Sequence, residues 1–455
     1  MSKKLESLIS KLRYLNSLII NISKTNEEIL HKERDIETSL NAMEEKLENQ
    51  IARQEEIKAQ LKHSIIKAEA LLETSNKNAD YVNLEYLYLL QNIKKKILLV
   101  GFYGARNLGD ELMLQKVYAD LEVDKNNIYV LMCDNKELDV FRYEGMNILH
   151  YPKTKFDYNF LANQFECVVF GGGAIIDDSQ YKKENSYTFD MGRIYAELSL
   201  AFIQKNKRVY SLGLSTSREL TDAEYIKKIS KIIRESSYFS VRDRYSARLL
   251  EKVSGEKINQ INDIVLTYEK LLVLRRSDQK FVIGIIWICY DNMKQQLQYL
   301  IKQLLCLEKN EELEIKCIPF YDYRDCDRLF YASIKEYFNN DDRITITDMP
   351  WNFRDAYIEL SNCDLILSMR YHGAVIGLMA GVETCSLLYA EHEHYYNKMA
   401  DIYEKFDQKE KLFLSVEEIV EYISIQNAED AKEKKRKRFD NSEYEKAVKK
   451  IGESI

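Results

Sequence analysis

Ile97-Leu98-Leu99-Val100 is followed at once by Gly101-Phe-Tyr-Gly104-Ala-Arg106-Asn107-Leu-Gly109-Asp110-Glu111, and this stretch decides the fold. Four branched apolar residues in succession are typical of a strand that is buried on both faces. Three glycines within the next nine residues predict a tight loop. Asp110 and Glu111 then favour the start of a helix, where carboxylates meet the positive end of the helix dipole. Since residues 1–96 contain neither glycine nor proline, the chain changes character here.

The segment before this strand, residues 1–93, has the pattern of an N-terminal α-helical coiled coil. Apolar residues follow a heptad repeat from Ile29 onward, and Gln50, Gln54 and Ser64 interrupt its seam. Association through this segment would make the protein a homo-oligomer or dock it to a partner. The alternative is a helical layer that folds back on the globular part of the chain. Neither interpretation assigns chemistry to these residues.

Length and composition set the broad class of the protein. With 455 residues the chain can form two globular domains and an appendage. Its net charge of -7 argues against general nucleic-acid binding, which requires a basic face. Eight cysteines occur singly, without a C-x-x-C pair, and we interpret them as reduced residues of a cytosolic protein rather than zinc ligands or a disulfide framework. The apolar run Leu18–Ile20 is too short to span a bilayer, so we expect a cytoplasmic protein and leave peripheral contact with the inner face of a membrane open.

Strand and helix patterns alternate over residues 94–268 and again over 269–428, which predicts two α/β domains built on parallel sheets. The expected strands are 97–100, 128–132, 147–150, 167–170, 208–212, 238–241, 281–287, 313–318, 343–347 and 364–368. The expected helices are 110–121, 189–204, 222–234, 291–306, 326–338 and 353–361. Residues 429–455 form a charged tail, which we expect to be a solvated helix. Contact of its basic run, 432–438, with anionic lipid is the alternative.

Two further strand ends of the first domain carry marked residues, and ligands on such sheets bind beyond the carboxyl ends of strands. Gly171-Gly172-Gly173 lets another group approach the backbone closely, or makes a tight strand-to-helix turn. Asp177 and Asp178 follow it. Arg242 can hold a phosphate or carboxylate through two parallel hydrogen bonds, or belong to a structural network with Asp243.

In the second domain, Ser368-Met-Arg370-Tyr-His372-Gly373 lies where a strand passes into an apolar helix. The first turn of a helix has unpaired N–H groups and a positive potential. A guanidinium and an imidazole at that position predict an anion site beside a group that can transfer a proton. The structural alternatives are a capping role for His372 and an ion pair of Arg370 with Asp364 or Asp348.

His392 and His394 are the weakest of these candidates, and the site they would suggest is a metal site. Their spacing suits a strand or loop, and no third ligand is evident nearby. We therefore predict no metal and no cofactor.

These features together resemble the polysaccharide pyruvyltransferase family over roughly residues 95 to 405. Each piece is weak alone, but their order and spacing are fairly specific. The pieces are Gly101–Gly104, Asn107–Glu111, Gly171–Gly173, Gly213 after Tyr210-Ser-Leu, Val241-Arg242-Asp243 with Ser246, Asp263 after Ile261-Asn262, and Ser368–His372.

The resemblance implies two Rossmann-like domains in a GT-B-like arrangement, here preceded by the coiled coil. It implies transfer of a pyruvyl group from phosphoenolpyruvate to hydroxyls of a bacterial cell-surface glycan or its lipid-linked precursor, forming a ketal. The donor would be bound by Arg242, Arg370, His372 and Gly171–Gly173. We expect His372 to be the acid or to stabilise the leaving phosphate, and Asp110 or Asp178 to be the base. Tyr103, Asn107, Asp110 and Glu111 would lie near the acceptor.

Two other functions remain as alternatives at this stage. One is a GT-B glycosyltransferase that uses a nucleotide sugar. The other is a non-catalytic coiled-coil assembly protein, which is favoured by Trp287 standing where related chains often carry arginine.

Overall fold

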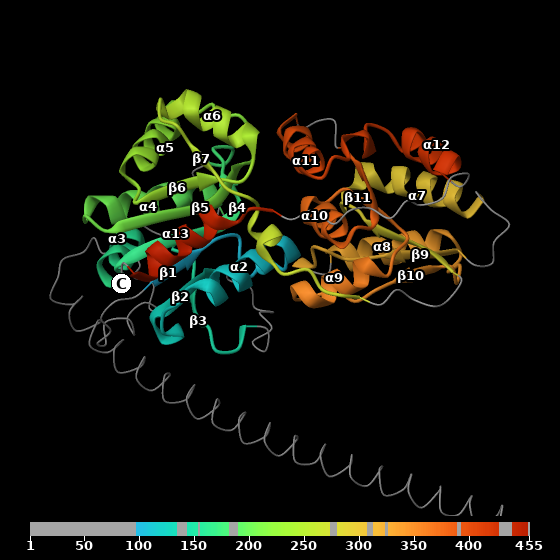
Figure 1. The fold of residues 1–455 in the computed structure, drawn as a ribbon, viewed down its shortest axis with the longest axis horizontal. Coiled ribbons are helices and arrows are strands. Elements are labelled where there is room, and N and C mark those ends of the chain that lie inside the picture. Colours follow the sequence, from blue (N-terminus) through green and yellow to red (C-terminus); the bar gives the residue numbers. More distant parts are fainter. Residues whose placement is uncertain are drawn as a thin grey trace, which may run out of the picture. The chain divides into compact units, whose positions relative to one another are not determined.

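The computed structural model of the protein describes residues 97–133, 143–152, 155–181, 190–273, 280–306, 313–323, 326–388, 393–426 and 439–453. The predicted coiled coil, residues 1–93, lies outside the described residues. All described elements belong to one compact unit of the chain, Asp80–Ile455, and form two lobes that each contain one sheet (Figure 1).

The first lobe is built on seven strands in the order β3-β2-β1-β4-β5-β6-β7, and all neighbouring pairs are parallel. The strands are β1 (Ile97–Val100), β2 (Ile128–Met132), β3 (Asn147–His150), β4 (Cys167–Ile176), β5 (Arg208–Thr216), β6 (Tyr238–Val241) and β7 (Asn259–Gln260). The helices are α2 (Leu108–Asp120), α3 (Lys155–Gln164), α4 (Met191–Gln204), α5 (Ala223–Glu235) and α6 (Arg244–Ser254), with 3-10 helices η2 (Lys125–Asn127) and η4 (Ile264–Thr267).

Alternation along β1 explains why this sheet is covered on both faces. Ile97 and Leu99 belong to the core cluster that contains α2, whereas Leu98 and Val100 belong to the cluster that contains α4. Successive side chains of a strand point to opposite faces, so an unbroken apolar run requires helices on both.

The second lobe is built on six parallel strands in the order β10-β9-β8-β11-β12-β13. The strands are β8 (Phe281–Ile286), β9 (Leu313–Cys317), β10 (Ile344–Ile346), β11 (Leu365–Ser368), β12 (Glu383–Leu387) and β13 (Leu412–Phe413). The helices are α7 (Asp291–Cys306), α8 (Cys326–Tyr337), α9 (Phe353–Ser361), α10 (Tyr371–Ala380), α11 (Glu393–Lys405) and α12 (Val416–Gln426), with the 3-10 helix η6 (Lys409–Lys411). The prediction of two parallel-sheet α/β domains is confirmed.

The three glycines of β4 are part of the strand, so the interpretation of Gly171–Gly173 as a tight strand-to-helix turn is wrong. The strand continues to Ile176, and its pairing with β5 shifts register between Gly173 and Ile176. Gly172 and Gly173 have φ values of 93° and 97°. Only glycine adopts such values readily, which accounts for an irregular strand where a turn was expected.

The charged tail forms helix α13 (Ser442–Glu453), and our expectation of a solvated helix is wrong for one of its faces. Tyr444, Ala447, Val448 and Ile451 are buried in the core cluster that contains α2. The Tyr444 hydroxyl donates to Asp120 at 2.9 Å. The 3-4 spacing of these four residues places them on one helical face, which the surrounding lysines and glutamates obscured in the sequence.

One core cluster crosses from lobe to lobe. It joins α2, η4 and α13 to α9 and α10 of the second lobe. The ring of Tyr268, just after η4, stacks on Phe353 of α9 with centroids 4.3 Å apart. Among the described residues, no helix has both the length and the apolar content needed to cross a bilayer.

The docking of α13 gives a stability prediction. Ile451→Ala removes a fully buried side chain and should lower the free energy of unfolding by about 2–5 kcal/mol. Lys449→Ala, on the exposed face, should change it by less than about 0.5 kcal/mol. Urea unfolding measures both values, and equal effects would show that α13 is not packed on the first lobe.

Candidate functional site

A buried ionic cluster joins the lobes. Arg242 follows β6, Asp263 precedes η4, and His372 lies in the first turn of α10. Arg242 Nη1 lies 2.7 Å from Asp263 Oδ2 and 3.3 Å from His372 Nε2, and that nitrogen is 3.5 Å from the same Asp263 oxygen. An arginine of the first lobe and a histidine of the second therefore meet on one carboxylate.

Local structure positions each member of this cluster. Asp263 Oδ1 accepts from Val265 N at 2.8 Å, so the capping of η4 leaves Oδ2 for Arg242 and His372. Gly109, in the first turn of α2, gives the imidazole its space. A Cβ at this glycine would lie 1.7 Å from His372 Nδ1.

Asp110 and Lys398 add a buried acid and a buried base. Burial raises the pKa of Asp110 to about 7, although Arg242 and Lys398 pull it down. Burial, together with repulsion from Arg242, lowers the pKa of Lys398 to about 8. The Tyr371 ring is close to both cations of the site, with its centroid 4.7 Å from the Arg242 guanidinium carbon and 5.9 Å from Lys398 Nζ. With pKa values of about 7 and about 8, Asp110 and Lys398 can each change charge near neutral pH.

His372 and Asp263 are shifted in the directions that favour a neutral imidazole beside a carboxylate. Burial lowers the pKa of His372, and Asp263 only partly opposes it. Burial alone would raise the pKa of Asp263, but Arg242 and His372 reverse this and hold that pKa below its usual range. Arg242 Nε is buried and has no hydrogen-bond partner among the described residues. A buried guanidinium with an unused donor suits an incoming anion.

Arg370 lies outside this cluster although it is only two residues from His372. Its Nη2 donates to Asp327 Oδ1 at 2.5 Å and its Nε to the Trp287 carbonyl at 3.3 Å. The ion pair proposed with Asp364 or Asp348 is therefore wrong. Asp364 instead accepts from Val282 N at 2.9 Å, and the partner of Arg370 comes from α8.

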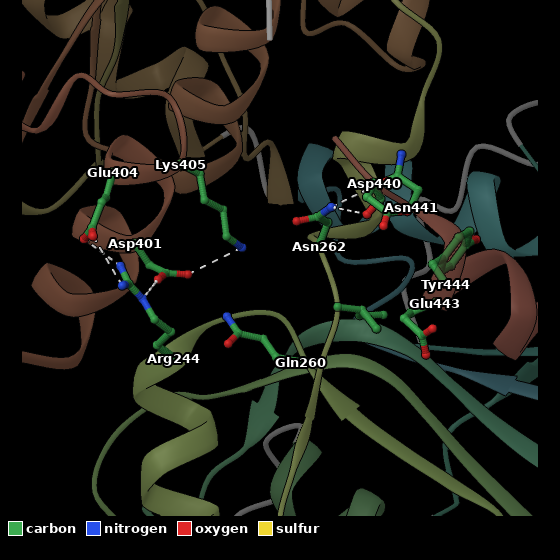
Figure 2. A pocket seen from close by; sticks show the side chains of 11 residues that line it. Arg244, Gln260, Asn262, Asp401, Glu404, Lys405, Asp440, Asn441, Glu443 and Tyr444 are labelled. Atoms are coloured by element: carbon green, nitrogen blue, oxygen red, sulfur yellow. Dashed lines mark hydrogen bonds and ion pairs between the residues drawn. The ribbon is translucent and has the colours of Figure 1, made fainter. Parts of the chain in front are cut away.

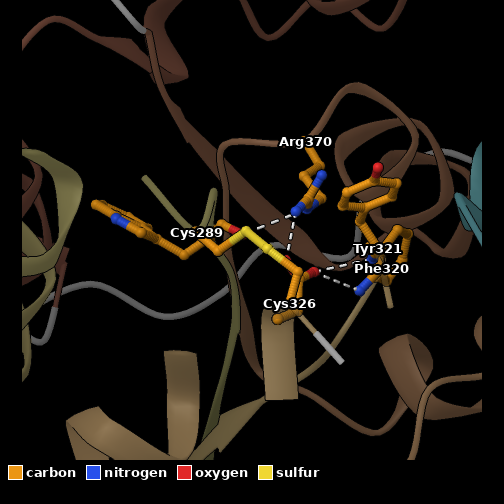
Figure 3. Close-up of a disulfide and its surroundings, with 7 residues drawn as sticks. Cys289, Phe320, Tyr321, Cys326 and Arg370 are labelled. Atoms are coloured by element: carbon orange, nitrogen blue, oxygen red, sulfur yellow. Dashed lines mark hydrogen bonds and ion pairs between the residues drawn. A yellow bond between two sulfur atoms is a disulfide. The ribbon is translucent and has the colours of Figure 1, made fainter. Parts of the chain in front are cut away.

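Cys289 and Cys326 form a disulfide beside Arg370 (Figure 3). The interpretation of all eight cysteines as single reduced thiols is wrong for this pair. The two residues are 37 positions apart, and they meet because β8 and β9 are neighbours and their following loops leave the sheet at the same edge. No local spacing rule detects such a pair.

The glycines of β4 face side chains of the first lobe itself. Tyr103 donates its hydroxyl to the Gly171 carbonyl at 3.0 Å. A Cβ at Gly172 would lie 2.5 Å from Met113 Sδ, and one at Gly173 would lie 3.1 Å from Asp110 Oδ1. The close approach expected here is therefore made by α2 and its preceding loop, and Gly173 lies against the carboxyl group of Asp110.

The remaining predicted residues occupy supporting positions. Glu111 is buried, accepts from Gly104 N at 2.9 Å, and has its pKa raised to about 8 by burial. Asn107 forms an isolated bridge with Tyr321 of the second lobe. Asp178, two residues after β4, accepts from Thr221 N and Asp222 N just before α5.

The predicted histidine pair cannot be placed. His392 and the side chain of His394 lie outside the described residues.

A polar cavity of about 490 Å³ adjoins the cluster (Figure 2). Its lining carries four carboxylates against two cations, and both cations are paired: Arg244 with Asp401 and Glu404, and Lys405 with Asp401. Lys405 also donates to the Arg242 carbonyl at 3.3 Å. The remaining lining residues are Gln260, Ile261, Asn262, Asp440, Asn441, Glu443 and Tyr444. This excess of negative charge disfavours a second anion and suits a neutral polar ligand.

Three residues of the cluster were missed as site residues. Asp263 was noted only as part of a motif, and its position one residue before a short apolar run was the available indication of a cap. Tyr371 lies between two candidates, Arg370 and His372, and was assigned no role of its own. Lys398 belongs to a chain in which 31% of residues are charged, so only burial distinguishes it.

Residues 107–392 match the profile of the polysaccharide pyruvyl transferase family. No curated protein matches the sequence.

Two similar solved structures are both described as UDP-GlcNAc 2-epimerases. The enzyme from Methanocaldococcus jannaschii is 12% identical over 79% of this chain and 99% of its own, with a TM-score of 0.50. A putative enzyme from Listeria monocytogenes is 12% identical over 79% and 95%, with a TM-score of 0.49. At this identity the likeness concerns the fold, which is GT-B-like.

The matched region contains both lobes' contributions to the cluster, namely Asp110, Arg242, Asp263 and His372. The chain belongs to the polysaccharide pyruvyl transferase family.

Proposed function

We propose that the protein transfers a pyruvyl group from phosphoenolpyruvate to two hydroxyls of a glycan or its lipid-linked precursor, forming a ketal. The observation that carries this proposal is the buried contact of Arg242 with His372 across the lobes, beside the N-terminus of α10. A guanidinium, an imidazole and a helix N-terminus at one point favour a phosphorylated donor.

The donor carries a phosphate and a carboxylate, so it needs more than one cation. Arg242 and Lys398 both lie near the Tyr371 ring, 4.7 and 5.9 Å from its centroid, and can share the phosphate. Arg370 would bind the carboxylate through its Nη1, which takes part in neither its contact with Asp327 nor its contact with the Trp287 carbonyl. Gly171–Gly173 contribute by letting Asp110 approach β4 closely. A dianionic donor would raise the pKa of His372 and so charge it when the site is occupied.

In the reaction we propose, the methylene carbon of phosphoenolpyruvate gains a proton and the neighbouring carbon becomes electrophilic. One sugar hydroxyl adds to that carbon and loses its proton to the base. A second hydroxyl then displaces phosphate and gives its proton to the leaving phosphate, so two C–O bonds form and one breaks. His372 is the acid, Asp110 is the base, and Asp178 has a supporting position at the start of α5.

The acceptor proposal combines the cavity with the loop before α2. The cavity is lined by amides and carboxylates, which match sugar hydroxyls, and Asn262 on its wall precedes Asp263 of the cluster. Tyr103, Asn107 and Glu111 would then hold the loop that presents Asp110, since Tyr103 and Glu111 are fully buried.

The alternatives make different binding predictions. A glycosyltransferase would bind a nucleotide sugar, and an assembly protein would bind neither donor. Trp287, which favoured the non-catalytic alternative, is buried and offers its carbonyl to Arg370, so it is compatible with a donor site.

Donor binding is the first test. Phosphoenolpyruvate at 100 times its Kd should stabilise the protein by about 2.7 kcal/mol in a thermal-shift assay, and UDP-GlcNAc should not. Arg242→Gln should abolish the shift because it removes the central cation. Arg248→Gln, on the exposed face of α6, should keep it. A shift with UDP-GlcNAc alone, or an unchanged shift in Arg242→Gln, contradicts the proposal.

The pH dependence tests Asp110. A general base acts in its ionised form, so kcat/KM for the donor should rise with pH through an apparent pKa near 7. Asp110→Asn should lose this limb and about 100-fold or more in rate. Asp342→Asn, at an exposed turn, serves as the control.

Stability supplies an independent reading of the same group. The folded-state pKa of Asp110 is raised above 3.8, so its stabilising contribution is present at low pH and is lost as pH rises through about 7. Asp110→Asn should therefore lose less stability between pH 6 and 8 than the wild type. If the wild type and Asp110→Asn have the same pH profile of activity and the same pH profile of stability, Asp110 is not the base.

A further inference from the structure

The disulfide lies between the two segments that hold Arg370 (Figure 3). Cys289 is two residues after Trp287, whose carbonyl accepts from Arg370 Nε. Cys326 directly precedes Asp327, whose Oδ1 accepts from Arg370 Nη2. The covalent bond thus joins the end of β8 to the start of α8, and each joined segment supplies one partner of the same guanidinium.

Asp327 also connects Arg370 to the loop after β9. Its Oδ2 accepts from Phe320 N at 3.0 Å and Tyr321 N at 2.9 Å, and the Arg370 guanidinium lies 5.4 Å from the centre of the Tyr321 ring. The carboxylate next to Cys326 therefore orders both Arg370 and the backbone of the loop after β9.

That loop is also in contact with the first lobe. Phe320 accepts through its carbonyl from Leu108 N at 2.9 Å, and Tyr321 pairs with Asn107. Leu108 begins α2, the helix whose first turn contains Asp110. Breaking the disulfide can therefore alter the position of Arg370 through its two partners. It can also alter the loop before α2, because Asp327 orders the loop after β9 and that loop contacts Asn107 and Leu108.

We propose that Cys289 and Cys326 are a reversible dithiol–disulfide pair whose disulfide form positions Arg370 for the donor. This rests on the proposed function. Two equivalents of a small thiol reduce the pair to two cysteines and are themselves oxidised to one disulfide, so two electrons and two protons are exchanged. Both cysteines are partly exposed and therefore within reach of such reagents. The expectation of a cytoplasmic protein favours a reversible bond, since disulfides in reducing compartments are typically transient or redox-sensing.

A metal site is the competing use of the same atoms. The two sulfur atoms and a carboxylate oxygen of Asp327 lie within 4.8 Å of one another, and reduction would make both sulfurs potential metal ligands. However, Asp327 already accepts three hydrogen bonds, from Arg370 and from two backbone amides. Metal binding would break the Arg370 pair, so we favour the redox role and make the metal an outcome of the test.

The experiment compares donor affinity in the oxidised full-length protein, the protein reduced with dithiothreitol, and Cys289→Ser/Cys326→Ser. Calorimetry with phosphoenolpyruvate measures the Kd, and mass spectrometry without reductant verifies the bond. Reduction and the double substitution should each weaken binding by about tenfold, and reductant should not affect the double variant further. Cys306→Ser, an exposed free cysteine, is the matched control and should bind as the wild type does.

A double-mutant cycle separates positioning from general loosening. In an Arg370→Ala background, removal of the disulfide should change the Kd no further, because its effect acts through that guanidinium. Additive losses, an unchanged Kd after reduction, or absence of the bond by mass spectrometry overturns the inference while leaving the proposed function intact. If Zn²⁺ restores donor affinity to the reduced protein, the redox inference is overturned as well. No donor binding by the oxidised wild type overturns the proposed function as well.

Discussion

The structure depends on the meeting of Arg242 and His372 over the carboxylate of Asp263. Three ionisable groups from distant parts of the chain are buried together, and each is tolerable there only because the others are present. Removing one partner of a buried ionic group leaves an uncompensated charge, which typically costs 3–5 kcal/mol. The contact therefore links the relative position of the lobes to the chemistry of the site, since the arginine belongs to one lobe and the histidine to the other.

Burial rather than pairing sets the character of the surrounding groups. Asp110 and Lys398 have opposite charges, yet desolvation moves both pKa values toward neutrality, to about 7 and about 8. Groups tuned in this way are typical of sites that transfer protons. The adjoining cavity differs in its charge, because its cations are already paired and its remaining charge is negative. The anionic donor and the neutral acceptor that we propose would thus have separate, adjacent environments.

Sequence reasoning succeeded where the determinant was local and failed where it was not. The run Ile97–Val100 has one buried conformation, and β1 has the predicted bounds. Gly171–Gly173 was misread because three glycines suggest a turn, while the pairing of β4 with β5 keeps them extended. The tail was misread because its apolar face of four residues is diluted by charge. Arg370 was assigned carboxylates near in sequence, whereas its partner, Asp327, is 43 residues away.

The amino-acid sequence by itself determined the two parallel sheets and the family, because buried runs, helix starts and ordered motifs are properties of neighbouring residues. Only the tertiary structure decided that Asp263 and Lys398 join the cluster, that Arg370 stands apart with Asp327, and that Cys289 meets Cys326. Burial and charge pairing depend on what the rest of the chain places within a few ångströms of a group. No pattern along the chain contains that information.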